Sequence, residues 1–225
     1  MPTHERNVWI VKKWTIVLLV AFAGILTVSQ IGCSMLATVA HVVGADMVPA
    51  EYDELKNCKL AVVTISDSSQ YSDDVSAKML SRKVSDVLLN NVRGVSLIRE
   101  EQIEQWRDEN GWDTSDFLSI GRGVKAEKVL GIELTNLQLR DGKTMYRGRS
   151  DVNLIVIDVE SGDVVYRKEI DEYSYPVSAG QHTSETTEVK FRKLYLSMLS
   201  RHIGRHFHKY DHTDLFASDG ALASQ

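Results

Sequence analysis

The stretch KLAVVTI, residues 59–65, decides the fold because it is a short run of apolar and β-branched side chains. Such a run is typical of a buried strand. The polar residues 66–70 that follow it predict a loop, and Ser72 offers a side-chain oxygen that can cap a helix before Asp73 and Asp74. Apolar residues then recur at helical spacing, at positions 75, 79, 80, 84, 87 and 88. The folded part therefore opens with a strand, a loop and a helix that has one core-facing side.

The segments that follow extend this pattern into a sheet. Residues 95–98 predict a brief strand, residues 99–109 predict a charged helix that ends at Gly111, and Thr114 can cap another short helix. Residues 128–134 form a third apolar run, after which Asp141-Gly142 gives a strong hairpin signal. The expected order is β-α-β-α-α-β-β-β, which predicts an α/β fold with a single mixed-sheet domain.

A helix from Thr187 to Lys209 is expected after the sheet. Its apolar residues fall on one stripe: Phe191, Leu194, Tyr195, Met198, Leu199, Ile203 and Phe207. The charged residues from Glu188 to Lys209 give a net charge of +5. We expect the apolar stripe to pack on the sheet, with the basic side chains facing water, anionic lipid headgroups or an acidic partner.

The chain opens with a leader that resembles an export signal. Arg6, Lys12 and Lys13 precede the uncharged run 14–28, and Gly32-Cys33 follows. Three interpretations are open: lipidation of Cys33 after cleavage before it, a retained transmembrane helix, or a cleaved signal that frees the protein. Residues 14–33 are about long enough to cross a hydrocarbon core of ~30 Å. We therefore expect export and membrane attachment, with the body facing the periplasm or the cell exterior.

These patterns divide the chain into five segments. The expected boundaries are a signal peptide or membrane anchor over 1–33, a tether over 34–57, an α/β domain over 58–175, a loop and amphipathic helix over 176–214, and a loose tail over 215–225.

Charge and cysteine content exclude several classes of protein. The whole chain carries −5 and the leader contributes +2, so the remainder carries −7. This balance argues against general nucleic-acid binding. Cys33 and Cys58 are the only cysteines, too few for a disulfide-stapled scaffold, so the fold must depend on a hydrophobic core.

Four segments carry a resemblance to the CsgG-like, TolB amino-terminal-like and LpoB-like α/β modules of bacterial envelope lipoproteins. They are 60–66, 84–99, 120–131 and 156–165. Residues 29–33 also resemble the bacterial lipobox, in which a small residue precedes the modified cysteine. The resemblance covers roughly 59–170 and implies a non-enzymatic envelope domain that works by protein contacts.

Few residues suggest a catalytic or metal-binding site. Ser66, Ser68 and Ser69 lack the glycine-flanked elbow of a serine nucleophile. His202 and His206 are spaced i, i+4, as two metal ligands could be, but the glutamate of an HExxH site is absent. We expect no catalytic residue, no cofactor and no metal, with His202 and His206 as the alternative for a metal.

The sequence therefore predicts a membrane-anchored envelope adaptor or accessory lipoprotein whose protein partner it does not name. The expected contact residues are Asp67, Ser68, Ser69, Gln70, Tyr71, Arg201 and Arg205. Two alternatives are a periplasmic ligand- or metal-binding domain that uses the histidine cluster, and a structural subunit of a homo-oligomer.

Overall fold

The computed structural model describes residues 47–67, 75–111, 116–177 and 180–211. The chain divides into two compact units, Met1–Met47 and Val48–Gln225. The predicted leader with Cys33, the loop residues 68–71 and the tail 215–225 lie outside the described residues. Among the helices that the structure describes, none combines the length and the apolar character needed to cross a membrane.

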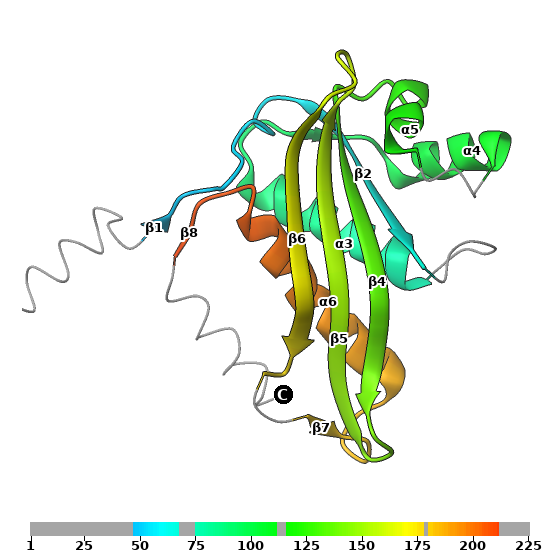
Figure 1. Ribbon diagram of the computed structural model, residues 1–225, viewed down its shortest axis with the longest axis vertical. Coiled ribbons are helices and arrows are strands. Elements are labelled where there is room, and N and C mark those ends of the chain that lie inside the picture. Colours follow the sequence, from blue (N-terminus) through cyan, green and yellow to red (C-terminus); the bar gives the residue numbers. More distant parts are fainter. Residues whose placement is uncertain (1–46, 68–74, 112–115, 178–179, 212–225) are drawn as a thin grey trace, which may run out of the picture. The chain divides into compact units, whose positions relative to one another are not determined.

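The second unit is built on a six-stranded mixed sheet with the strand order β3-β2-β4-β5-β6 (Figure 1). Strand β2 (Lys59–Ser66) pairs in parallel with β3 (Ser96–Leu97) and with β4 (Lys128–Asp141). The antiparallel half consists of β4, β5 (Met145–Asp158) and β6 (Val164–Tyr175), and the short β7 (Gln181–His182) pairs with β5. Two more short strands, β1 (Met47–Val48) and β8 (Tyr210–Asp211), lie outside this sheet.

Four helices in the described residues cover the sheet. The long helices α3 (Val75–Asn91) and α6 (Glu188–Arg205) lie together on one face, and the short helices α4 (Glu100–Asn110) and α5 (Phe117–Gly123) lie near the top of Figure 1. Helix α6 begins where the sequence predicts, because the Thr187 hydroxyl accepts a hydrogen bond from the Lys190 backbone N–H.

Two hydrophobic cores, one on each face of the sheet, follow from the alternation of side chains along the strands. In β2, Leu60 and Val62 point into the core beneath α3 and α6, whereas Ala61 and Val63 point into the smaller core beneath α4 and α5. The apolar run at 59–65 is continuous because both of its faces are buried.

The smaller core covers only part of its face of the sheet. Further along the same face, β4 and β5 carry polar pairs in place of apolar ones. The Asn153 side-chain amide donates to Glu133 at 2.7 Å, and Asn136 donates to Asp151 at 2.7 Å. This half of the face is therefore polar where the other half is core.

The predicted α/β class and the mixed sheet are confirmed, and the order of the main elements follows the sequence prediction. The short helix α5 is capped differently from the prediction. Asp116, rather than Thr114, occupies the cap position, and its carboxylate accepts from the Leu118 backbone N–H at 3.0 Å. The two-residue strands β1, β7 and β8 were not predicted, since pairs this short have no periodicity.

Candidate interaction surface

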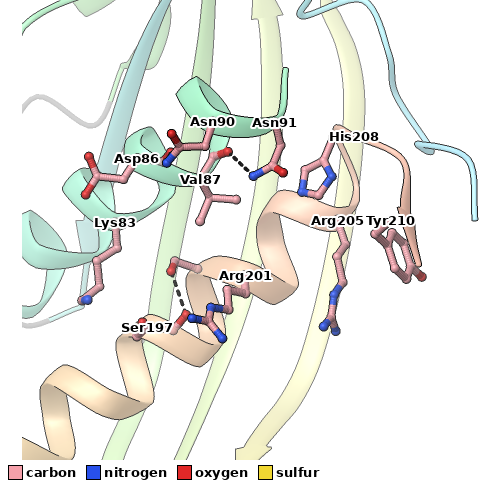
Figure 2. A pocket seen from close by; sticks show the side chains of 11 residues that line it. Lys83, Asp86, Val87, Asn90, Asn91, Ser197, Arg201, Arg205, His208 and Tyr210 are labelled. Carbon is pink, nitrogen blue, oxygen red and sulfur yellow. Dashed lines mark hydrogen bonds between the residues drawn. The ribbon is translucent and has the colours of Figure 1, made fainter. Parts of the chain in front are cut away.

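A groove of about 640 Å³ lies between α3 and α6 and contains both basic residues that the sequence singled out on the last helix (Figure 2). The lining residues come from three places, namely the second half of α3, the second half of α6 and the segment after α6: Lys83, Asp86, Val87, Asn90, Asn91, Ser197, Ser200, Arg201, Arg205, His208 and Tyr210. We call this feature the α3–α6 groove.

The two helices approach each other closely at Gly204. A Cβ atom on Gly204 would lie 2.3 Å from Cγ1 of Val87, which is far shorter than any contact between non-bonded carbon atoms. A side chain at position 204 would therefore push the helices apart. Gly204 and Val87 form this contact, and Val87 is also one of the residues that line the groove.

The groove is electropositive. Lys83, Lys193 and Arg201 have no ion-pair partner among the described residues. Burial lowers the pKa of the Lys83 ammonium, and the nearby charges of Lys193 and Arg201 lower it further, against the opposing effect of Asp86. The guanidinium carbon of Arg205 lies over the ring of Tyr210, 5.3 Å from the ring centroid.

Asp67, the remaining predicted contact residue that the structure describes, lies outside the α3–α6 groove. It follows β2 directly, where its carboxylate accepts from the Asn136 backbone N–H at 3.1 Å and its own N–H donates to the Leu134 carbonyl. Helix α3 begins shortly after this point and runs for about 25 Å before it reaches the last of the groove residues. The structure therefore does not bring Asp67 together with Arg201 and Arg205.

The segment before β2 is attached to β6 and α6 through one charged side chain, Glu51. The Glu51 carboxylate accepts from the Tyr166 hydroxyl at 3.0 Å and from the Lys168 ammonium at 3.1 Å, and it lies 3.2 Å from Nδ1 of His206. Partial burial would raise the pKa of Glu51, but the hydrogen bonds from Lys168 and Tyr166 outweigh it and hold that pKa below its ordinary value. We call Glu51 and these three partners the junction.

The next residue strengthens this attachment. Tyr52 is 8% exposed, its N–H donates to the His206 carbonyl at 2.9 Å, and its ring packs against Tyr166 and Phe207. Residues 48–57, which the sequence analysis assigns to the tether, thus include side chains that are packed on α6 and β6.

His202 and His206 lie close together, as their i, i+4 spacing predicts, with ring centroids 5.7 Å apart. His202 lies against the ring of Tyr173 at 4.9 Å, and burial, reinforced by the neighbouring cations, lowers the pKa of His202 to about 4. Burial also lowers the pKa of His206, against the opposing charge of Glu51. In the described part of the chain, no group of three or more histidine, cysteine, aspartate or glutamate side chains could hold a metal ion.

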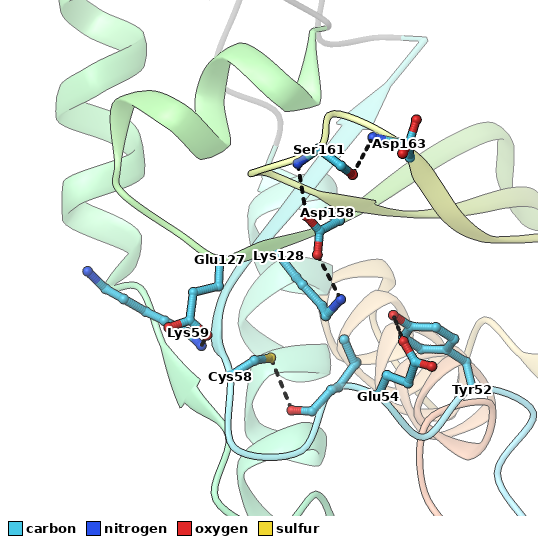
Figure 3. Close-up of polar contacts among 10 residues, drawn as sticks. Tyr52, Glu54, Cys58, Lys59, Glu127, Lys128, Asp158, Ser161 and Asp163 are labelled. Carbon is cyan, nitrogen blue, oxygen red and sulfur yellow. Dashed lines mark hydrogen bonds and ion pairs between the residues drawn. The ribbon is translucent and has the colours of Figure 1, made fainter.

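Cys58 is buried at the entrance to β2 (Figure 3). Its thiol donates to the Leu55 carbonyl at 3.1 Å, and burial raises its pKa. A thiol held in this way is a poor nucleophile. Nearby, Lys128 pairs with Asp158 at 3.1 Å and Glu127 accepts from the Lys59 backbone N–H, so the charged side chains here support the sheet.

No pattern in the sequence indicated the roles of Glu51 and Lys83. Glu51 is 115 residues from its partner Tyr166, so no local pattern could indicate their contact. Lys83 is one of three basic residues on α3, with Lys78 and Arg82, and only the packing of α6 beside α3 distinguishes it.

Comparison with known proteins gives structural likenesses only, since no protein-family model and no curated protein matches the sequence. The C-terminal domain of LpoB from Salmonella enterica is 16% identical, with 51% of this chain and 82% of that chain covered and a TM-score of 0.34. Lipoprotein GNA1162 from Neisseria meningitidis is 12% identical, with 64% and 96% covered and a TM-score of 0.41. A PelC dodecamer from Paraburkholderia phytofirmans is 12% identical, with 68% and 91% covered and a TM-score of 0.37.

These solved structures include LpoB, one of the groups named in the sequence resemblance, and none of the three is a CsgG or TolB protein. At these identities and TM-scores, the likeness does not assign the chain to a family.

Proposed function

We propose that this chain is a membrane-anchored accessory protein of the cell envelope that works through contacts with other proteins and catalyses no reaction. The basic and apolar leader supports export and attachment, by a lipid on Cys33 or by a retained helix. The absence of catalysis is supported by the histidines, because His202 packs against the ring of Tyr173 and His206 is held at Glu51.

The observation that carries the proposal is the junction. Glu51 and Tyr52 follow the anchor segment closely in sequence, and they are fixed to β6 and α6 by the contacts given above. From Cys33 to Val48 the chain has 15 steps, which span at most ~50 Å. A body tethered over this reach stays at an effective concentration on the order of millimolar beside partners in the same membrane.

Two separate contact surfaces belong to this proposal. The first is the segment 67–71, which begins at Asp67, and the second is the basic side of α6 with Arg201 and Arg205. Because α3 separates Asp67 from Arg201 and Arg205, a protein bound at the first surface and a ligand bound at the second would not compete.

Site-specific photo-crosslinking in cells tests the protein contact. A photoreactive amino acid at Gln70 of the full chain is expected to give a discrete adduct with an envelope protein, whereas the same group at Lys125, an exposed residue after α5, is not. A chain that starts at residue 48 should lose most of the adduct because it lacks the tether. Equal adducts from both positions, or none from Gln70, would contradict the proposed contact.

A further inference from the structure

Three cationic side chains and one serine form a row along one side of α6. Lys193, Ser197, Arg201 and Arg205 are spaced four residues apart, so they lie one above another on the helix surface. Lys83 of α3 faces this row across the α3–α6 groove. Two helices thus direct positive charge into the same hollow.

Lys83, Lys193 and Arg201 form no ion pair within the described residues, although Asp86 lines the same groove and partly offsets the charge of Lys83. Beside Lys83 on α3, Lys78 pairs with Glu104 and Arg82 pairs with Glu100 at 2.8 Å. In a chain whose net charge is −5, cations can readily be paired. Cations gathered together repel one another in the folded state, and a bound anion removes that repulsion.

The lining of the groove favours a small, strongly charged anion. Val87 is its one aliphatic side chain, so the groove lacks the buried apolar anchors on which protein partners depend. Arginine and lysine side chains bind phosphate through charge-assisted hydrogen bonds, and the hydroxyl of Ser197 adds a donor. A volume of about 640 Å³ accommodates a phosphate with its attached glycerol.

The geometry points to the α3–α6 groove as a binding site for a phosphate group, with Lys83, Arg201 and Arg205 as its ligands. The source that we assign is an anionic lipid headgroup, and this assignment rests on the proposed membrane attachment. The tether holds the body within ~50 Å of a membrane surface, where such headgroups are the most abundant phosphates.

The reactivity of the Lys83 amine reports on the site directly. The full chain is purified in neutral maltoside micelles and treated with a trace of an acetylating reagent, and acetylation is measured residue by residue by mass spectrometry. Four conditions are compared: plain micelles, micelles with phosphatidylglycerol, plain micelles with inorganic phosphate, and plain micelles with polyglutamate. Lys125, exposed and distant in the sequence, is the internal reference.

Phosphatidylglycerol is expected to slow acetylation of Lys83 and to leave Lys125 unchanged. Arg201→Glu removes a charge-assisted contact, so it should raise the lipid concentration needed for protection about tenfold. Lys143→Glu, at an exposed position between β4 and β5, changes the net charge equally and should have no effect on protection of Lys83. Unchanged near-UV circular dichroism confirms that both variants are folded.

The remaining outcomes are decisive as well. Protection by inorganic phosphate but not by the lipid would support the phosphate site and overturn the lipid source. Protection by polyglutamate alone, or by none of the additions, would overturn the site. Protection by phosphate in a protein that cell fractionation finds in the cytosol would refute the proposed function and leave the site standing.

Discussion

His202 is expected to make the fold sensitive to acid. The structure lowers its pKa to about 4, chiefly by burial and then through the charges of His206 and Arg205, whereas an unfolded histidine titrates near ~6.5. The folded state therefore binds fewer protons than the unfolded state between these two values. The free energy of unfolding is thus fully retained above pH ~6.5 and falls as the pH drops towards 4.

The size of the effect follows from the two pKa values. At pH 5 the unfolded histidine is almost fully protonated and the folded one is mostly neutral, so protonation stabilises the unfolded state by about 2 kcal/mol relative to pH 7. His202→Phe keeps a flat ring against Tyr173 and removes the titratable group. His202→Gln removes the titratable group without adding apolar surface. Both variants should lose this part of the pH dependence, while the contribution of His206 remains.

The free energy of unfolding can be measured at pH 7 and pH 5 by urea unfolding of residues 48–225, the unit that contains both hydrophobic cores. The wild-type protein should lose about 2 kcal/mol more stability than either variant between the two pH values. Parallel curves of unfolding free energy against pH for the wild type and His202→Phe would refute the reasoning.

Three further substitutions test other parts of the structure. Tyr195→Phe should lower the free energy of unfolding by about 1–3 kcal/mol in urea titrations, because the buried hydroxyl of Ser150, 2.7 Å away, loses its partner; a loss below ~0.5 kcal/mol would show that the bond contributes little. Gly204→Ala should cost about 1–3 kcal/mol through its clash with Val87, and Val87→Ala should recover part of that cost in a double-mutant cycle, whereas strictly additive effects would contradict the close contact. Glu51→Ala should accelerate hydrogen exchange of the backbone amide that follows it, and unchanged exchange would mean that the junction does not hold this segment.

Local sequence patterns predicted those strands and helices in which the spacing of apolar residues alone shows which side chains are buried. The apolar run of β2 and the helical stripe of α6 both became core, because alternation and 3.6-residue spacing are direct consequences of backbone geometry. The faces on which Leu60 and Ala61 are buried could not be assigned, since a strand that is covered on both sides shows no alternation.

The candidate sites were predicted only in part. Arg201 and Arg205 stood out because charge accumulates along α6, and both line the groove. Lys83 and Glu51 did not stand out, because each acquires its role from residues that are distant in the sequence. Contacts of this kind depend on how the helices pack on the sheet.

The central claim is that the leader carries the folded body out of the cytoplasm and keeps it at a membrane. Mass spectrometry of the amino terminus, performed on separated membrane and soluble fractions of the native cell, tests it most directly. We predict membrane-bound protein that carries either a diacylglyceryl group on Cys33 or an intact leader. Soluble cytosolic protein that retains Met1 would contradict the account.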